Sequence, residues 1–432
     1  MPGEASARST IFALSSGRPP AAVAIVRTSG PKAHDAARLL TRLPPPRQAA
    51  LRTLCDPVDG RVIDEALVLR FDGPKSATGE NVVEYQCHGG RAVVDALLAT
   101  LAAIDGLREA EPGEFTRRAF ANGRIDLTEA EGLADLLEAE TEAQRRTALA
   151  SANGGLKRQI ETWQMRLVEL AARAEAAIDY VDEDEVAGGN EALGEDAQVL
   201  ADELCEWLSR PRVEPLRDGV RVVVAGPTNS GKSSLVNAIA EAERAIVTEI
   251  PGTTRDTIEV PLAIGGAPFV LVDTAGLRDT DDRVERIGID RARGEYASAD
   301  ILLWLGETDR APEHHCMIKV HSRADEVGRG IAPAQSIAVS AVTRVGITTL
   351  IAGIVERANA LLPGEDALAL NRRQAAALAD VEKDLRDASA TPDVVLAADH
   401  FRSARNSFDR LTGRAGVEDM LDALFGRFCL GK

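Results

Sequence analysis

The pattern of apolar and polar positions changes three times along the chain. In residues 1–120, short β-rich runs (AAVAIVR, EALVLRF, NVVEYQC) alternate with helical runs such as AVVDALLATLAAI. Short strands interleaved with helices are typical of a compact α+β domain. We therefore expect residues 1–120 to form the first domain.

A helical region follows over residues 121–215. The segment LTEAEGLADLLEAETEAQ opens with Thr128 and Glu131 at capping-box spacing, and Asn153-Gly154-Gly155 interrupts the pattern. Beyond this break, apolar residues recur at steps of four and three residues: Leu156, Ile160, Trp163, Leu167 and Leu170. This spacing predicts an amphipathic helix in a helical hairpin. The acidic stretch 182–191 is predicted to be a solvated loop rather than a metal site.

Residues 216–366 alternate strands with helices. The short apolar run 222–225 is typical of a buried parallel strand, and TIEVPLAI and FVLVD, joined by Gly265-Gly266, predict a hairpin. With ILLWL, MIKV and SIAVS as further strands, the pattern predicts a doubly wound α/β domain. Residues 367–432 turn helical again. Because they cannot easily make a core of their own, we expect them to pack on the helical region, which makes the α/β domain an insertion.

Composition and charge limit the class of protein. The 432 residues include 50 Lys/Arg and 68 Asp/Glu, a formal net charge of −18. A globally basic surface is absent, so any RNA would need a local basic patch or the help of a partner. Five scattered cysteines without a C-x-x-C pair argue against a disulfide framework or a structural zinc site. Since no apolar run has the length of a membrane span and no secretory leader is evident, we expect a soluble cytoplasmic protein.

A phosphate-binding motif follows the first strand of the α/β region. Residues 226–233, GPTNSGKS, fit G-x-x-x-x-G-K-[ST] between a predicted strand and a predicted helix. Backbone N–H groups at the helix N-terminus can surround phosphate oxygens, Lys232 can reach the β and γ phosphates, and the Ser233 hydroxyl can bind Mg²⁺. Lys232 is also a candidate catalytic residue. The nucleotide contacts expected here are Asn229, Ser230, Gly231, Lys232, Ser233 and Ser234.

Two further segments stand where a GTPase needs them. DTAG, residues 273–276, would place Asp273 beside the metal and the Gly276 N–H near the γ-phosphate. PGTTRD, residues 251–256, offers Thr254 as a second magnesium ligand on a loop that can order around the γ-phosphate. The candidate contacts are Thr248, Glu249, Ile250, Pro251, Gly252, Thr253, Thr254, Asp273, Thr274, Ala275 and Gly276.

The guanine-reading motif is incomplete. The usual Asn-Lys-x-Asp is replaced by Ser322-Arg323-Ala324-Asp325. Asp325 can still accept two hydrogen bonds from guanine N1 and N2, and the Arg323 stem can cover the base. Because Ser322 replaces Asn, we expect a lower affinity. Ser340-Ala341-Val342 would close the base pocket.

Two other features depart from Ras-like proteins. Leu277 stands where they carry the Gln that orients water, so another group must do so. Glu285 is the candidate, although a charged residue in a polar loop is as often merely solvated. The segment GETDRAPEHHC between two strands is too short for the expected helix, which could weaken nucleotide binding or change dimerisation. We expect His314 and His315 within it to face solvent rather than bind metal.

Several motifs occur together in one order: GPTNSGKSS, PGTTRD, DTAGLR and VERIGI, with TGENVVEYQCHGG (78–90), PGEFTRRAFANGRIDLTEAEGLADL (112–136) and the terminal FCLGK. In this combination essentially the whole chain resembles the MnmE (TrmE) family of tRNA uridine-5-carboxymethylaminomethyl modification GTPases. The resemblance implies a multi-domain α/β and α fold with an N-terminal α+β folate-binding and dimerisation domain, a helical domain and an inserted Ras-like P-loop G domain.

The same resemblance implies an activity and partners. It implies a potassium-activated GTPase that forms a homodimer, and a heterotetramer with an FAD- and NADH-dependent partner (MnmG or GidA). Together they would add an aminomethyl or carboxymethylaminomethyl group to C5 of the wobble uridine of certain tRNAs. The carbon would come from 5,10-methylene- or 5-formyl-tetrahydrofolate.

Roles for single residues follow from the resemblance as well. K⁺ would be held by Asn229, Thr253 and backbone oxygens near Thr248 and Ile250, and Glu285 would position the water. The implied folate contacts are Arg27, Glu84, Arg124 and Lys432. Cys429 would be an active-site thiol near the folate. It would not be a prenyl anchor, because the final Lys does not fit a C-a-a-X box.

Two alternatives stay open. A regulatory GTPase switch that modifies nothing would carry the same G domain; folate binding and the loss of modified wobble uridine in a deletion strain would distinguish the two. An ATP-using P-loop protein is favoured a little by Ser322, but Asp325 and PGTTRD argue against it.

Overall fold

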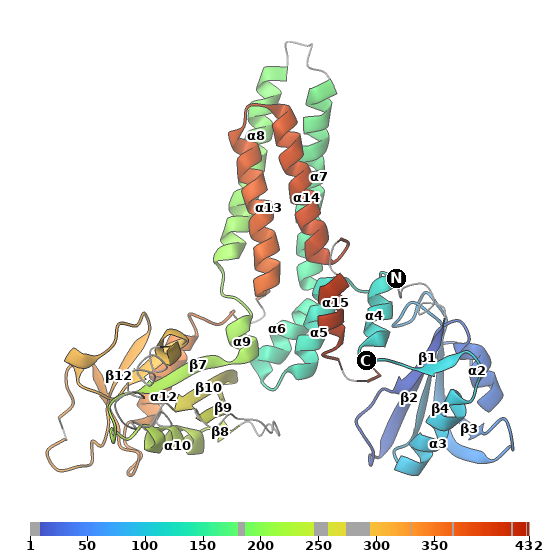
Figure 1. Ribbon diagram of the computed structural model, residues 1–432, viewed down its shortest axis with the longest axis horizontal. Helices are drawn as coiled ribbons and strands as arrows, with labels where there is room; N and C mark the ends of the chain where they lie inside the picture. The colour runs from blue at the N-terminus through green and yellow to red at the C-terminus, as the bar shows by residue number, and fades with distance from the viewer. Residues whose placement is uncertain are drawn as a thin grey trace, which may run out of the picture. The chain divides into compact units, whose positions relative to one another are not determined.

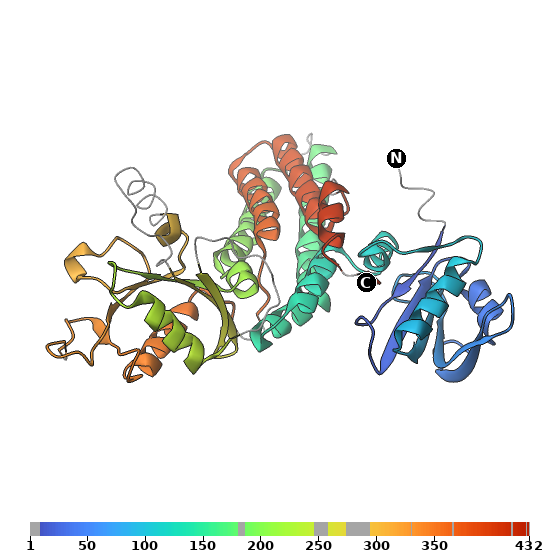
Figure 2. The same cartoon turned by 60° about the horizontal axis from the view of Figure 1, so that its bottom comes forward.

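The computed structural model describes residues 9–179, 186–245, 258–273, 294–329, 331–364, 367–415, 418–428 and 430–431. The chain forms two compact units, which are drawn in Figures 1 and 2. Unit 1 comprises Met1–Ala134 and Asp409–Lys432, and unit 2 is Asp135–Phe408. Unit 2 is therefore inserted into the sequence of unit 1.

Unit 1 is built on a six-stranded sheet of order β3-β4-β5-β2-β1-β6. Its strands are β1 (Thr10–Leu14), β2 (Val23–Ser29), β3 (Ala50–Cys55), β4 (Val62–Phe71), β5 (Val82–His88) and β6 (Leu107–Glu109). Neighbouring strands are antiparallel except β1 and β6. Helices α2 (Ala33–Leu40) and α3 (Arg91–Ala102) pack against the sheet around the fully buried Tyr85, Leu97 and Leu101. This confirms the predicted α+β fold.

Three more helices share a second core in unit 1. They are α4 (Glu114–Ala121), α5 (Leu127–Glu138) and α15 (Glu418–Phe425). Leu127 and Ala130 of α5 pack with Leu424 and Phe425 of α15, and α15 also contacts α4. The prediction that the last helices pack on residues 121–215 is therefore incomplete. The final helix, α15, also packs on α4, which belongs to the N-terminal domain.

The start of α5 differs from the prediction. Because the helix begins at Leu127, Thr128 lies inside it and cannot be the cap. Asp126 and Glu129 make the reciprocal pair instead: the Glu129 N–H donates to Asp126 Oδ1 at 2.9 Å, and the Asp126 N–H donates to Glu129 Oε2 at 2.8 Å. The predicted Thr128–Glu131 capping box is wrong by two residues.

The helical part of unit 2 comprises α6 (Glu142–Ala152), α7 (Gly155–Asp179), α8 (Val186–Ser209), α13 (Arg372–Ala390) and α14 (Val394–Thr412). The four long helices lie side by side in Figure 1. All five residues of the predicted apolar stripe on α7 are buried. Helix α8 begins at Val186, so part of the acidic stretch predicted as a loop is helical. Packing of Leu193, Ala197 and Leu200 further along α8 favours extension of the helix towards its N-terminus despite the glycines at positions 188 and 189.

The α/β part of unit 2 is a seven-stranded sheet of order β13-β12-β11-β7-β10-β9-β8. Its elements are β7 (Val220–Ala225), α10 (Lys232–Ala242), β8 (Arg244–Ala245), β9 (Ile258–Ile264), β10 (Ala267–Asp273), β11 (Ile301–Trp304), β12 (Met317–His321), β13 (Ser336–Ala338) and α12 (Ile347–Ala358). Alternate residues of β7 enter two different cores, so both of its faces are buried, as expected of a central parallel strand. Strands β9 and β10 form the predicted antiparallel hairpin.

The shortened segment before β12 holds only a three-residue 3-10 helix, Thr308–Arg310. His314 was predicted to face solvent, but its ring is bound on both sides. The Cys316 N–H donates to Nδ1 at 3.1 Å, and Nε2 lies 3.0 Å from the Ala299 carbonyl oxygen. His314 thus ties the short segment to the sheet.

The two connections between the bundle and the α/β part lie side by side. The Val213 N–H donates to the Leu370 carbonyl at 3.1 Å, which joins the chain entering the α/β part to the chain leaving it. A short helix, α9 (Glu214–Asp218), follows the entry. The α/β part is an insertion, as predicted; the exact boundaries at residues 120, 215 and 366 stay predictions.

Candidate functional site

Residues 226–231 form the loop between β7 and α10, in the strand–loop–helix order that the sequence predicts. Gly226 has a φ of 149°, which L side chains rarely adopt, and a Cβ there would lie 3.1 Å from Leu305 Cβ. The turn therefore requires glycine. It leads the chain to the N-terminus of α10, whose first N–H groups have no acceptor within the helix. Such a terminus is suited to phosphate oxygens.

Lys232 is the first residue of α10. Its Nζ donates to the carbonyl oxygens of Gly226 at 2.9 Å and Pro227 at 3.0 Å. The ammonium group is thereby held across the start of the loop. Its positive charge adds to that of the helix N-terminus, and both favour an anion at this place.

Asp273 ends the strand next to β7. Strands β10 and β7 are parallel, with Asp273 paired to Val224, and the residue is only 3% exposed. Because the carboxyl ends of parallel strands meet at one edge of a sheet, its carboxylate lies at the same edge as the loop. Ser233 is exposed on the first turn of α10. Hydroxyl and carboxylate oxygens are ligands that Mg²⁺ accepts, so the donor set fits that ion.

The base-recognition segment contacts the phosphate loop directly. The Ser322 hydroxyl donates to the Ser230 carbonyl at 2.7 Å, and Arg323 Nη2 donates to the Asn229 carbonyl at 2.5 Å. The structure therefore brings Ser322 and Arg323 to the loop across about ninety residues of sequence. That Arg323 covers the base stays a prediction. Its contact with the Asn229 carbonyl is a second feature, which the sequence motif did not indicate.

Asp325 and Ser340 lie together on the other side of this segment. The Ser340 hydroxyl donates to the Asp325 carboxylate and holds the pKa of that carboxyl below its usual value. Ser340 is itself 1% exposed and accepts a hydrogen bond from the Thr343 N–H at 3.0 Å. Ala324 is bound through its N–H to the Val339 carbonyl, whereas Val342 is 83% exposed.

Other predicted site residues fall outside the described part of the chain. They are Thr248, Glu249, Ile250, Pro251, Gly252, Thr253, Thr254, Thr274, Ala275, Gly276, Glu285, Cys429 and Lys432. Their roles stay predictions.

The predicted folate contacts belong to unit 1. Arg27 on β2 and Glu84 on β5 are direct cross-strand neighbours, and Arg27 Nη2 lies 2.8 Å from Glu84 Oε1. Both side chains are partly exposed, at 24% and 17%. Arg124 lies beside Gly79, because a Cβ on that glycine would be 3.2 Å from Arg124 Cγ. The structure thus pairs Arg27 with Glu84, which the sequence did not indicate.

The C-terminal tail reaches the same sheet. Gly431 has a φ of 89°, and a Cβ there would lie 2.1 Å from the Leu14 carbonyl oxygen. The Ser15 hydroxyl donates to the Gly431 carbonyl at 2.8 Å. Since Leu14 pairs with Val26, the residue before Arg27, the tail ends beside the strands that carry the predicted folate contacts.

Sequence reasoning missed a buried ionic network in unit 1. Arg118 is 2.9 Å from Glu114 and 3.1 Å from Glu80, and Arg108 is 2.5 Å from Glu114. Burial alone would raise the pKa of Glu114, but hydrogen bonds led by that from Arg108 outweigh it and hold the pKa low. The spacing of Glu114 and Arg118 at i and i+4 was the available signal. The network fixes α4 against the sheet.

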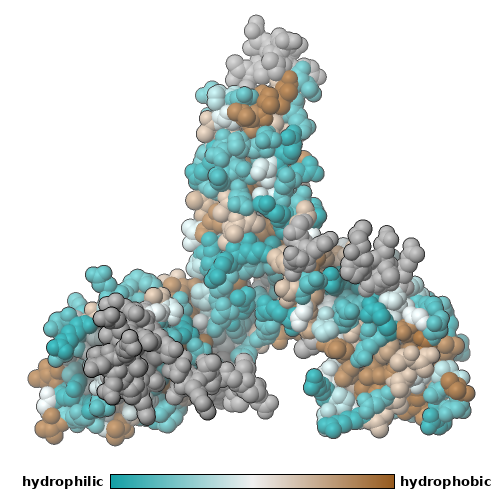
Figure 3. Space-filling model, in the orientation of Figure 1, coloured by the Kyte–Doolittle hydropathy of each residue, from teal (hydrophilic) through white to brown (hydrophobic). Residues whose placement is uncertain are grey.

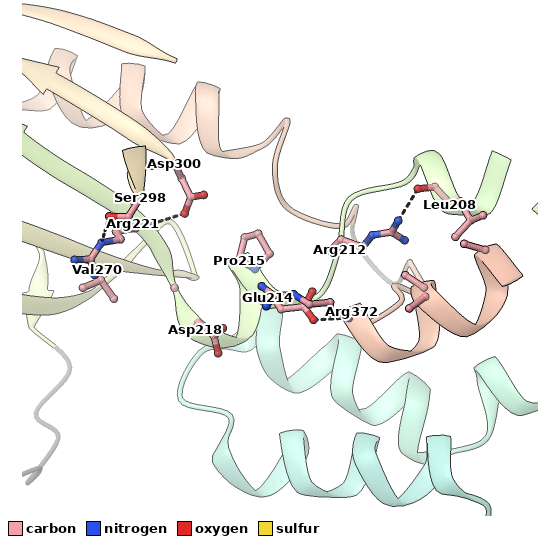
Figure 4. Close-up of a pocket in the computed structure, with 14 residues that line it drawn as sticks. Leu208, Arg212, Glu214, Pro215, Asp218, Arg221, Val270, Ser298, Asp300 and Arg372 are labelled. Atoms are coloured by element: carbon pink, nitrogen blue, oxygen red, sulfur yellow. Dashed lines mark hydrogen bonds between the residues drawn. The ribbon is translucent and has the colours of Figure 1, made fainter. Parts of the chain in front are cut away.

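A cavity of about 850 Å³ lies between the base of the bundle and the α/β sheet (Figure 4). It is lined at the start of β7 by Arg221, whose N–H donates to Asp300 at 2.8 Å, and across the cavity by Arg212. One Arg212 nitrogen, Nη2, donates to the Leu208 carbonyl at 2.9 Å. Because the phosphate loop follows the opposite end of β7, this cavity is separate from the nucleotide site.

Among the described residues, no helix is both long and apolar enough to cross a membrane. The same residues contain no cluster of three or more His, Cys, Asp or Glu side chains suited to holding a metal ion.

A mostly parallel sheet with a lysine-bearing glycine loop, and a buried Asp at the end of the adjacent strand, defines a P-loop nucleotide-binding protein of the GTPase type. Two family models match: "GTP-binding protein TrmE N-terminus" over residues 10–124 and "MnmE helical domain" over residues 127–429. The chain belongs to the MnmE family of tRNA modification GTPases.

Full-length relatives agree with this assignment. Proteins named tRNA modification GTPase MnmE are 53% identical in Erythrobacter litoralis, 50% in Novosphingobium aromaticivorans and 48% in Zymomonas mobilis. Each alignment covers 98% of this chain and 99–100% of the relative. Among solved structures, the G domain of the T. maritima FeoB iron transporter is 25% identical, with a TM-score of 0.25 over 32% of this chain and 98% of that one. The family assignment does not rest on that structure.

Proposed function

We propose that this protein hydrolyses GTP as part of tRNA modification in the cytoplasm. The observation that carries the proposal is the loop between β7 and α10, with Lys232 held across it and Asp273 at the adjacent strand end. Family membership over the full length supports the link to tRNA, since the relatives are named tRNA modification GTPases.

The residues around the loop have separate roles in this proposal. The N–H groups at the start of α10 and the Lys232 ammonium bind the β and γ phosphates, and Asp325 accepts hydrogen bonds from guanine N1 and N2. Ser233 and Asp273, with Thr254, would hold Mg²⁺, which when bound neutralises phosphate charge. Glu285 positions the attacking water. Leu277, which stands where Ras-like proteins carry Gln, has no polar group for this role.

K⁺ activation is the next part of the proposal. Asn229 and Thr253, with backbone oxygens near Thr248 and Ile250, would hold the ion. Asn229 is an exposed residue, which supports access of a cation to it. A cation at this place would stabilise charge that develops between the β and γ phosphates.

The chemistry on tRNA is proposed to use folate bound by unit 1. Arg27, Glu84, Arg124 and Lys432 would contact the folate, and Cys429 would lie near it. The partly exposed Arg27–Glu84 pair and the approach of Gly431 to Leu14 support this location. An MnmG-type FAD-dependent partner would supply the redox step in adding the aminomethyl or carboxymethylaminomethyl group to the wobble uridine.

A homodimer through unit 1 is proposed as well. Leu51 on β3 and Leu67 on β4 are direct cross-strand neighbours, 60% and 42% exposed. Figure 3 shows apolar surface on this unit. Adjacent exposed leucines on a sheet favour burial against another protein surface.

Steady-state hydrolysis of GTP and ATP, each in K⁺ and in Na⁺ at equal ionic strength, tests the core of the proposal. We expect GTP-selective turnover that is much faster in K⁺, with the gain abolished by Glu285→Ala. Turnover indifferent to the cation would contradict the K⁺ mechanism. Normal wobble-uridine modification in a deletion strain would favour a regulatory switch instead.

A further inference from the structure

The Ser322 side chain has one hydrogen to donate, and the phosphate loop takes it. Its hydroxyl lies 2.7 Å from the Ser230 carbonyl oxygen, which can only accept, so Ser322 must be the donor. The residue is 5% exposed. Once that bond is made, Ser322 Oγ offers only lone pairs.

Guanine presents acceptors on the edge that the first residue of this motif usually faces. N7 and O6 are both acceptors. An Asn amide carries two N–H donors, so it can bind a loop carbonyl and still donate to N7, whereas a hydroxyl cannot do both. With Ser in place of Asn, the bond to the loop carbonyl is therefore retained and the bond to guanine N7 is lost.

We propose that Ser322 is a positioning residue that holds the phosphate loop and leaves guanine N7 unread. This inference rests on the proposed binding of guanine nucleotides. Base selectivity in this protein comes from Asp325 on the N1 and N2 edge.

The neighbouring residue supports a holding role for the segment. Arg323 Nη2 donates to the carbonyl of Asn229, the residue before Ser230, and Arg323 Nη1 lies 3.3 Å from Glu326. Two consecutive side chains therefore bind two consecutive carbonyls of the loop. Arg323 itself has a φ of 58°, and the Ala324 N–H donates to the Val339 carbonyl. The backbone of residues 323 and 324, which connects Ser322 to Asp325, is therefore fixed.

The test compares GDP with 7-deaza-GDP, in which N7 is replaced by C–H, by calorimetric titration of the full-length protein. We expect the wild type to bind the two nucleotides within about twofold of each other. The variant Ser322→Asn should bind GDP about three- to tenfold more tightly than 7-deaza-GDP, the effect of one net hydrogen bond. Ser322→Ala should weaken both nucleotides equally, since only the hold on the loop is lost.

Ser336→Ala is the matched control, because its hydroxyl makes a local bond to the Pro333 carbonyl in the same domain. It should leave both affinities unchanged. A wild type that binds GDP at least threefold more tightly than 7-deaza-GDP would overturn the inference. A folded Ser322→Asn that does not discriminate would also overturn it. Failure of folded wild type to bind GDP would overturn the proposed function, and the inference with it.

Discussion

Asp325 keeps its charge through a neighbour that is far away in the sequence. The hydrogen bond from Ser340 holds the pKa of Asp325 below its usual value, so the carboxylate stays ionised to a lower pH than an Asp without this partner. Only the ionised group can accept both guanine N–H donors. Guanine binding through Asp325 should therefore be present above this lowered pKa and be lost as the pH falls through it.

We predict that Ser340→Ala shifts the acid limit of GDP binding to higher pH. Without the hydroxyl, the pKa of Asp325 returns toward its usual value, so the carboxylate is protonated sooner as the pH falls. GDP affinity measured between pH 3.5 and 7 checks this shift. Thr343→Ala removes a nearby side chain but keeps the backbone N–H that binds Ser340, and it should leave the profile unchanged. Identical profiles for wild type and Ser340→Ala would contradict the assignment.

Lys232 gives a second prediction at this scale. Lys232→Ala should lower the rate of GTP hydrolysis by about 100-fold or more, because a preorganised charge next to the phosphates is removed. Lys383→Ala, an exposed lysine on the bundle, should change nothing. Single-turnover hydrolysis, with the protein in saturating excess over GTP, gives the rate. Equal rates for the two variants would mean that Lys232 does not act on the phosphates.

The strand, loop and helix around the phosphate motif could be predicted because the residues that form them are local in sequence. Residues 226–233 specify a strand end, a turn and a helix start without reference to the rest of the chain. The pairing of Arg27 with Glu84 could not be predicted, since the register of two strands decides it. The bonds from Ser322 and Arg323 to the loop depend in the same way on the order of strands in the sheet.

Among the secondary-structure elements, the bundle depends on the contact between α7 and α8. Trp163 on α7 is fully buried, its ring centroid lies 5.2 Å from that of Trp207 on α8, and its Nε1 donates to Glu203 at 2.8 Å. One side chain therefore combines apolar burial, an edge-to-face ring contact and a satisfied polar group.

We predict that Trp163→Ala destabilises the bundle by about 3–5 kcal/mol. The cavity that remains accounts for most of the loss, because Glu203 loses one hydrogen bond but keeps its ion pair with Arg166. Met165→Ala on the exposed side of α7 should stay within about 0.5 kcal/mol of the wild type. Urea unfolding followed by far-UV circular dichroism measures both. A small effect of Trp163→Ala would show that the bundle can repack around the gap.

Helix ends were harder to predict than helices. The stripe on α7 was clear from its spacing, but α5 begins two residues before the predicted start and α8 begins inside an acidic, glycine-containing stretch. A cap competes with nearby polar residues that offer the same bonds, as Asp126 does with Thr128. Packing further along α8 outweighs the local cost of glycine.

At the scale of the whole molecule, the α/β part enters and leaves the bundle at one place. The bond between Val213 and Leu370 keeps the two crossings together. We predict that a variant in which a short Gly/Ser linker replaces residues 214–369 retains a folded helical bundle, because closing so short a gap costs little entropy. Circular dichroism and thermal unfolding check this outcome. A chain that ends at Val213 lacks α13 and α14 and should unfold; similar behaviour of the two variants would contradict the prediction.

The contact of the C-terminal tail with Leu14 gives another prediction. Gly431→Ala should lower folate affinity by about tenfold, because the left-handed φ and the overlap with Leu14 together displace the tail. GTP turnover by the same variant should not change. Gly60→Ala also has a positive φ but meets nothing within 4 Å, so it separates backbone strain from loss of contact. Equal folate affinity in the two variants would remove the tail from the site.

The insertion of one part of the chain in another could be predicted because helical pattern resumes after residue 366. The final helix was misassigned in part, since an apolar face shows that a partner exists without showing which one. Leu424 and Phe425 would suit the bundle equally well by composition. Their close approach to Gly113 and α5 is settled only by the three-dimensional structure.

The core shared by α5 and α15 also sets an order in time. On the ribosome, Leu127 and Ala130 are made before unit 2, whereas Leu424 and Phe425 are made after it. At about 5–20 residues per second, the apolar face of α5 waits roughly 15 to 60 s for its partner. During this interval the nascent chain presents a face that chaperones or other nascent chains can occupy. The first unit to begin folding is thus the last to be completed.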